Sequence, residues 1–126
     1  RVELSIFGIE NCIVEPGGYP TTFMENLLKP SDNSQTTSYG DFMKFPEQMF
    51  GNFENVLKNN PQQDPQRVAD ALAELIEKPH GQRPFRTTVD FIGMADHITK
   101  YNDHLEQIMT GLYSNFGIGG LLHPKQ

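Results

Sequence analysis

The sequence predicts an α/β fold in which helices cover a small parallel sheet. Residues 10–14 form a short apolar run without polar alternation, which is typical of a parallel strand buried on both faces. Residues 65–78 carry an apolar stripe at helical spacing, and residues 84–89 form a second strand. A strand, a helical connection and a second strand together predict a parallel pair.

Length and composition limit the kinds of protein that this chain could be. Its 126 residues suit a single segment with a moderate core. The net charge of −6, without a basic stripe, argues against nucleic acid as a partner. No apolar run approaches the roughly 20 residues that span a bilayer, and no secretory signal is visible, so we expect no membrane partner. The lone Cys12 excludes an internal disulfide and favours the cytoplasm.

The first 23 residues are predicted to contain the end of a helix, a strand and a turn. Residues 1–7 have the pattern of a helix end, and the strand at residues 10–14 follows. Pro16 lacks a backbone donor and ends the ladder, while Gly17 and Gly18 let the main chain approach a ligand closely. In open α/β sheets, ligands bind at the carboxyl ends of the strands. The turn is therefore the first candidate site.

Residues 24–60 are predicted to be mainly helical. A short helix is expected from Thr21 or Thr22 to Leu28, followed by a polar loop at residues 30–38. A longer helix is predicted over residues 45–58, with Pro46 in its first turn and apolar residues at helical spacing: Met49, Phe50, Phe53, Val56 and Leu57. Residues 59–63 are predicted to form a polar turn.

Residues 61–126 are predicted to supply a helix, the last strand and a C-terminal helix. Asp64 caps a helix that starts at Pro65, and Pro79 stops it. Its apolar stripe consists of Val68, Ala71, Leu72, Leu75 and Ile76. After the strand at residues 84–89, a helix is expected over residues 95–114. The glycine-rich residues 117–120 follow a helix and precede none, so they are interpreted as a flexible tail rather than a phosphate loop.

Charged residues outside the turn indicate no further site. His97 and His104 lie seven residues apart, about 10 Å along a helix, which is too far for one ion, so no metal site is predicted. Arg83 and Arg86, near Asp90, are interpreted as strand-edge charges or subunit contacts.

Several motifs resemble short-chain dehydrogenases/reductases. Pro16, Gly17 and Thr21 match that family's Pro-Gly-x-x-x-Thr pattern after its sixth strand. Residues 64–69 (DPQRVA) resemble the start of its penultimate helix, and residues 83–90 resemble its last strand. Residues 101–117 resemble the tail of a poorly characterised subgroup. The resemblance covers nearly the whole chain in the right order.

This resemblance implies the C-terminal part of a Rossmann-like, doubly wound parallel sheet. It implies NAD or NADP as cofactor, with the nicotinamide end held by four residues of the turn: Pro16, Gly17, Gly18 and Thr21. It also places a substrate-binding lid in residues 24–60. Residues expected to reach an apolar alcohol or carbonyl substrate are Tyr19, Phe23, Met24, Leu27, Phe42 and Met43. Tyr19 could equally be a surface turn residue, and about half of the lid residues could be core.

Two motifs of the family are missing from this chain. The phosphate-cradling Gly-x-x-x-Gly-x-Gly loop is absent, and no tyrosine has a lysine four residues later. We therefore expect residues 1–126 to be the C-terminal half of a dehydrogenase, without catalytic residues of its own and inactive in isolation. Its expected partners are the missing N-terminal half and further copies, since the family often forms oligomers through residues such as 64–90. The alternative is a non-catalytic binding or interaction module derived from the same fold.

Overall fold

The computed structural model describes residues 1–28 and 30–125. Lys29, in the predicted lid, and Gln126, in the predicted tail, lie outside the described residues. The elements are, in chain order, α1 (Val2–Ser5), β1 (Ile13–Pro16), η1 (Met24–Asn26), η2 (Thr36–Met43), α2 (Lys44–Lys58), α3 (Gln66–Glu77), β2 (Arg86–Val89), α4 (Ala95–Asn115) and η3 (Gly119–Leu122).

The predicted α/β class is confirmed. β1 and β2 form a two-stranded parallel sheet in which Ile13 is in register with Arg86 and Pro16 with Val89. Both α3 and α4 contact this sheet. The side chain of Asn102 in α4 donates a hydrogen bond of 2.5 Å to Glu15 in β1, which fixes the helix to the strand.

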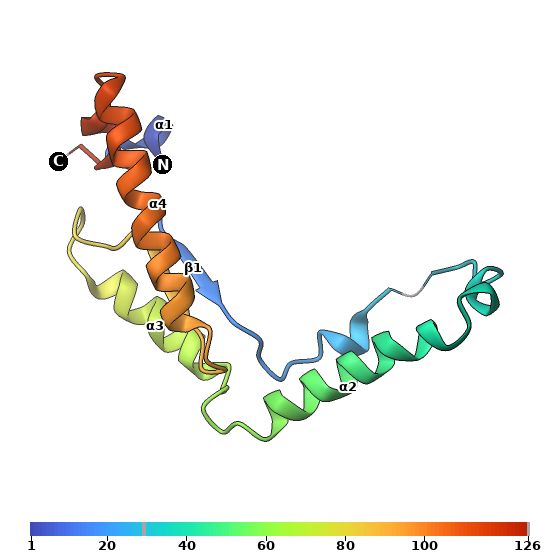
Figure 1. Ribbon diagram of the computed structural model, residues 1–126. Helices are drawn as coiled ribbons and strands as arrows, with labels where there is room; N and C mark the ends of the chain where they lie inside the picture. The colour runs from blue at the N-terminus through green and yellow to red at the C-terminus, as the bar shows by residue number, and fades with distance from the viewer. Residues whose placement is uncertain (29, 126) are drawn as a thin grey trace.

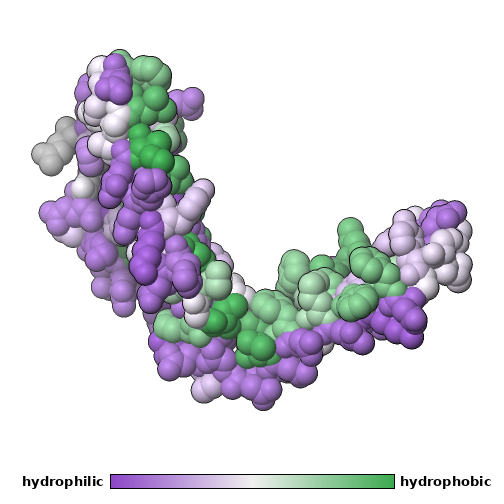
Figure 2. Space-filling view, viewed as in Figure 1, coloured by the Kyte–Doolittle hydropathy of each residue, from purple (hydrophilic) through white to green (hydrophobic). Residues whose placement is uncertain are grey.

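The molecule is bent, with two arms that meet at an angle (Figure 1). One arm holds the sheet with α1, α3, α4 and η3, and the other consists of α2 with η1 and η2. The arms are joined by the segment after β1 and by the turn between α2 and α3. Figure 2 shows that apolar side chains gather on the inner face of the angle.

Most helix predictions are confirmed to within one or two residues. Helix α2 begins at Lys44 rather than residue 45, and α4 spans Ala95–Asn115. Helix α3 starts at Gln66, where the backbone N–H donates to the Asp64 carboxylate at 2.9 Å, so Asp64 acts as the predicted cap. Local signals decide these boundaries.

The strand predictions were shifted. β1 begins at Ile13 instead of residue 10, because the Glu10 carboxylate accepts hydrogen bonds from Arg83 and from the Gly81 N–H instead of lying in the sheet. Cys12 precedes the strand and is only half-buried. β1 ends at Pro16 rather than at residue 14, and β2 begins at Arg86 rather than at residue 84.

Three other local predictions were wrong. The helix expected up to Leu28 is only the single 3₁₀ turn η1, since the Asn26 side chain bonds to the Thr22 carbonyl in place of a continued helix. The 3₁₀ segment η2 occupies the end of the predicted loop. The predicted flexible tail forms η3, in which Leu122 is buried against α1 and α4, and the Lys125 N–H donates to the Ser5 carbonyl.

The apolar core of the described residues is small. Four apolar residues are buried: Leu57, Leu75, Val89 and Leu122. Many large apolar residues are exposed, and no strand among residues 1–28 and 30–125 pairs with the other edge of β1. Two strands and such a core give little independent stability.

We therefore predict that the isolated segment of residues 1–126 self-associates or unfolds without cooperativity. Exposed apolar faces and an unpaired strand edge favour pairing with another chain. Sedimentation velocity at low micromolar concentration, combined with a thermal melt, measures both properties. A monomer with a sharp, cooperative melt would contradict the prediction.

Candidate functional site

The candidate site is built on the segment that leaves β1. The Ile13 N–H donates to the Phe85 carbonyl and the Gly17 N–H to the Val89 carbonyl, each at 2.8 Å. Because main-chain groups alternate sides along a strand, the Pro16 nitrogen points away from β2. Its missing N–H therefore takes no hydrogen bond from the sheet. The ladder ends at Gly17, directly before the predicted cofactor turn.

Gly17 and Gly18 are packed against neighbouring elements. A Cβ at position 17 would lie 2.0 Å from Oδ1 of Asp90, and a Cβ at position 18 would lie 2.5 Å from Cζ of Phe53 in α2. Both distances are far below a normal contact. Glycine is therefore required at position 17, because Asp90 is buried, whereas at position 18 the close atom is the end of the Phe53 side chain, which is 40% exposed.

Side chains then hold the turn in place. The Tyr19 hydroxyl donates to the Val89 carbonyl at 2.9 Å. The pKa of Tyr19 lies above its ordinary 10.0. Burial is the largest cause, the Asp90 carboxylate adds to it, and the Arg67 guanidinium lowers the pKa by a smaller amount. The hydroxyl is thus protonated at neutral pH and engaged as a donor, which suits a positioning role rather than proton transfer.

Beyond the turn lies a hollow of about 790 Å³ in the corner between the two arms. Its volume is within the range of roughly 300–1,000 Å³ that is typical of small-molecule sites. One wall is the segment from Pro16 to Glu25. The opposite wall comes from α2 and the start of α3 and consists of Phe50, Phe53, Glu54, Leu57, Lys58, Pro65 and Val68.

The chemistry of the hollow is that of a binding surface. Phenylalanine, leucine, valine and proline side chains form most of the α2 and α3 wall, and they would bind an apolar or planar group. The two charged residues on that wall form an ion pair with each other, with 2.6 Å between Nζ of Lys58 and Oε1 of Glu54. Polar contacts to a ligand would come from the main chain of the turn and from the hydroxyls of Thr21 and Thr22.

The structure brings together most of the sequence-predicted site residues. Seven of them line the hollow: Pro16, Gly17, Gly18, Tyr19, Thr21, Phe23 and Met24. Leu27, Phe42 and Met43 do not. Phe42 instead packs against Phe45, with ring centroids 5.9 Å apart, further out along the α2 arm.

Sequence reasoning missed three residues that shape the site. Gln63 was assigned to a polar turn, although it is the most deeply buried side chain of the described residues. Asp90 was treated as part of a charged strand edge, and Phe53 only as part of a helix stripe. Their roles depend on contacts distant in sequence, so no local pattern could reveal them.

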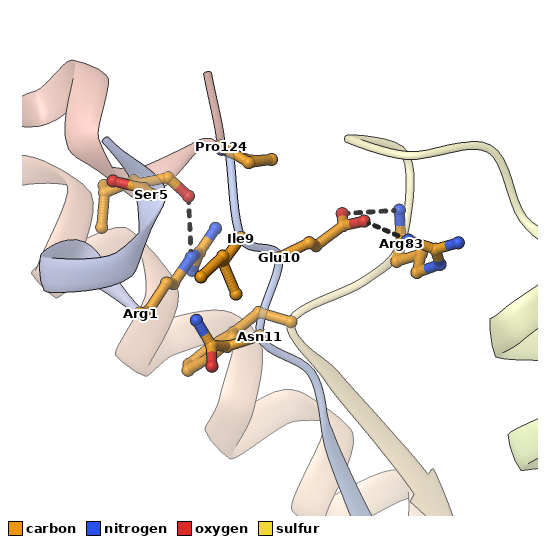
Figure 3. Close-up of a pocket in the computed structure, with 9 residues that line it drawn as sticks. Arg1, Ser5, Ile9, Glu10, Asn11, Arg83 and Pro124 are labelled. Carbon is orange, nitrogen blue, oxygen red and sulfur yellow. Dashed lines mark hydrogen bonds and ion pairs between the residues drawn. The ribbon is translucent and has the colours of Figure 1, made fainter. Parts of the chain in front are cut away.

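A second cavity lies where the N-terminal segment meets η3 (Figure 3). It measures about 20 Å³ and is lined by nine residues, among them Arg1, Glu10, Asn11 and Arg83. This is the size of one water molecule, too small for a substrate.

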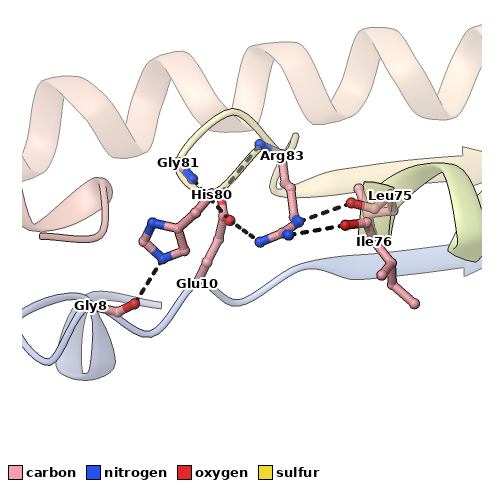
Figure 4. A network of polar contacts seen from close by, with 7 residues as sticks. All are labelled: Gly8, Glu10, Leu75, Ile76, His80, Gly81 and Arg83. Carbon is pink, nitrogen blue, oxygen red and sulfur yellow. Dashed lines mark hydrogen bonds and ion pairs between the residues drawn. The ribbon is translucent and has the colours of Figure 1, made fainter. Parts of the chain in front are cut away.

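The two arginines near β2 form ion pairs within the chain, and their predicted role in subunit contacts stays a prediction. Arg83 binds Glu10 at 2.7 Å and donates to the carbonyls of Leu75 and Ile76 at the end of α3 (Figure 4). His80 contacts the Gly8 carbonyl in the same network. Arg86 lies 3.6 Å from Glu15. These contacts tie the N-terminal segment to α3 and β2.

The described residues contain neither a candidate metal site nor a candidate membrane-spanning helix. No group of three or more His, Cys, Asp or Glu side chains in residues 1–28 and 30–125 is arranged to hold a metal ion. None of the helices in this same part of the chain has the length and apolar character needed to cross a bilayer.

The chain is thus an α/β segment in which a parallel strand ends at an apolar hollow, and in open α/β sheets ligands bind at the carboxyl ends of the strands. Comparison with known proteins adds one relative. The chain is 36% identical over 86 residues to the uncharacterized oxidoreductase YusZ of Bacillus subtilis (strain 168), a match that covers 64% of this chain and 28% of YusZ. The chain thus spans less than a third of that relative's length. No family model matches the chain.

Proposed function

We propose that residues 1–126 are the C-terminal segment of an NAD(P)-dependent short-chain oxidoreductase that acts, in the cytoplasm, on an apolar alcohol or carbonyl compound. The observation that carries the proposal is that the Pro16–Gly17 turn leaves the carboxyl end of a parallel strand and lines a hollow of ligand size. The similarity to an oxidoreductase supports it. The rest of the Rossmann-like sheet, the phosphate-binding loop and the Tyr-Lys pair would belong to a preceding segment.

The residues of the hollow fit the nicotinamide end of a dinucleotide. Its planar ring suits the apolar wall, and its carboxamide needs main-chain and hydroxyl partners such as those of Gly18 and Thr21. When bound, the dinucleotide would supply hydride transfer. This chain's own residues would orient the ring, with the main chain of residues 16–18 as the rigid wall, and exclude water with Phe23, Met24 and α2.

The test is a steady-state assay of the protein encoded by the complete reading frame that contains these residues. It uses NAD and NADP, each with a panel of apolar alcohols and ketones. Turnover with one dinucleotide is the expected result. The alternative function is a non-catalytic interaction module, which the exposed apolar face inside the angle would suit. Absence of both turnover and dinucleotide binding would support that alternative.

Thr21→Ala tests the site directly. We expect the Michaelis constant for the dinucleotide to rise up to about tenfold, because one hydrogen bond of about 1 kcal/mol is lost at the nicotinamide end. The fold should be unaffected, since the Thr21 hydroxyl accepts only a long 3.4 Å bond from the Phe23 N–H. Thr37→Ala, at an exposed position outside the hollow, is the matched control. Unchanged kinetics with both dinucleotides would remove Thr21 from the site.

A further inference from the structure

Gln63 is a buried amide next to the hollow. It lies in the turn between α2 and α3 and is only 1% exposed. It does not line the hollow, so it cannot touch a ligand there. Burial of a polar side chain is unfavourable unless its donor and acceptor are both used. The contacts of Gln63 show how they are used.

The two ends of the Gln63 amide bind two different segments. Its Nε2 donates to the Gly18 carbonyl in the turn, and its Oε1 accepts from the Phe91 N–H at 2.8 Å. The orientation of the amide is fixed by its partners, because a carbonyl needs a donor and an N–H needs an acceptor. A glutamine satisfies both, whereas an ionised carboxylate satisfies only Phe91.

Gln63 links the two segments that follow β1 and β2, beyond the last hydrogen bond of the sheet. The last ladder bond joins Gly17 to Val89. Gln63 lies between Gly18, the residue after Gly17, and Phe91, the second residue after Val89, and binds both. Asn60 strengthens the Phe91 side by donating from its amide to the Phe91 carbonyl at 2.9 Å. The turn between the helices therefore sets the distance between the segments that follow β1 and β2.

We propose that Gln63 is a positioning residue that holds the Gly18 main chain in the orientation a ligand in the hollow requires. This inference rests on the proposed dinucleotide function and extends it to a residue outside the hollow. Loss of the bond to Gly18 would let residues 18–21 move, and the affinity for the nicotinamide end would fall. The bond to Phe91 would not hold these residues in place, because it joins Gln63 only to the segment after β2.

Gln63→Glu tests the proposal in the protein from the complete reading frame. The substitution keeps the size and the acceptor to Phe91 but removes the donor to Gly18. At pH 8 we expect the Michaelis constant for the dinucleotide to rise at least about tenfold over wild type, because a buried hydrogen bond is replaced by an unfavourable pair of acceptors. Gln62→Glu, at the exposed neighbouring position, adds the same charge and is the control.

The pH dependence tests whether the missing hydrogen bond to Gly18 causes the rise in the Michaelis constant. A carboxyl buried at this position would have a raised pKa, and its protonated form donates a hydrogen bond as the amide does. The ratio of variant to wild-type Michaelis constants should therefore fall toward one as the pH is lowered to about 6. The same ratio for Gln62→Glu should stay near one throughout. A ratio for Gln63→Glu that matches the control at both pH values would overturn the proposal.

A neutral variant covers the case in which Gln63→Glu does not fold. Gln63→Asn keeps the amide but is one methylene shorter, so it cannot reach both partners. We expect the same rise in the Michaelis constant without pH dependence, and wild-type kinetics would overturn the proposal. If the wild-type protein shows neither turnover nor binding with NAD or NADP, the proposed function is wrong. If the wild-type protein is active and its Gln63 variants have the same kinetics, only the role of Gln63 is wrong.

Discussion

Gly17→Ala is expected to destabilise the protein by about 3 kcal/mol and to abolish dinucleotide binding in the hollow. The new methyl group would lie 2.0 Å from Oδ1 of Asp90 and 2.8 Å from its Cγ. Asp90 cannot easily move away, because it is buried and its Oδ2 accepts from the Met94 N–H at 2.9 Å, just before α4. Overpacking of this kind typically costs about 1–3 kcal/mol, and the displaced turn would lose its fit to the ligand.

A double substitution shows whether Asp90 is the cause. Asp90→Ala removes the clashing oxygen, so Gly17→Ala should cost much less in that background than in the wild type. Gly51→Ala and Gly111→Ala are the controls, because both positions are helical and open around the added methyl group. They should be neutral or stabilising by up to about 1 kcal/mol. Thermal melts and dinucleotide titrations of the protein from the complete reading frame measure these effects. An additive double mutant would contradict the explanation.

Arg83→Ala is expected to cost about 3 kcal/mol of folding free energy. It removes three side-chain hydrogen bonds and leaves the Glu10 carboxylate, whose side chain is only 8% exposed, without its ionic partner. The backbone N–H of residue 83, which also donates to Glu10, is present in alanine as well. Lys44→Ala is the control. It breaks an ion pair with Asp41 whose two side chains are 70% and 88% exposed, so its effect should stay below about 1 kcal/mol.

The cost of Arg83→Ala should shrink in acid. Burial raises the pKa of Glu10, but hydrogen bonds from the Gly81 N–H and from Arg83 more than offset this, and the pKa lies below its ordinary 4.5. A carboxyl with a lowered pKa stabilises the fold above its unfolded pKa and loses this contribution as the pH falls through the folded value. Denaturant melts of the wild-type and Arg83→Ala proteins from the complete reading frame, at pH 7 and below pH 4.5, measure the difference in their free energies of unfolding. An effect independent of pH would assign the cost to the carbonyl bonds alone.

The sequence predicts the helices well because their signals are local. Asp64 and Pro65 mark the start of α3, and the stripe from Val68 to Ile76 defines its length. The start of β1 was misjudged because Glu10 bonds to residues more than 70 positions away. The same reason hid the packing of Leu122 under α1.

The candidate site could be predicted only in part. The turn at Pro16 and Gly17 has a recognisable pattern, and the structure places it on the hollow. The side of the hollow formed by Phe53 and Leu57 could not be foreseen, because it depends on the angle between α2 and the sheet. Phe42 and Met43 were also predicted to reach the substrate, but they lie in η2, too far along the α2 arm to line the hollow.

The direction of the Pro16 nitrogen has a consequence for how far the sheet could grow. A further strand laid along the free side of β1 would find N–H groups at Cys12 and Val14 and none at the next outward position. Such a neighbour would find no donor at Pro16 and would lose one hydrogen bond of the ladder there. The proline therefore weakens strand pairing at the position where the chain begins to line the hollow.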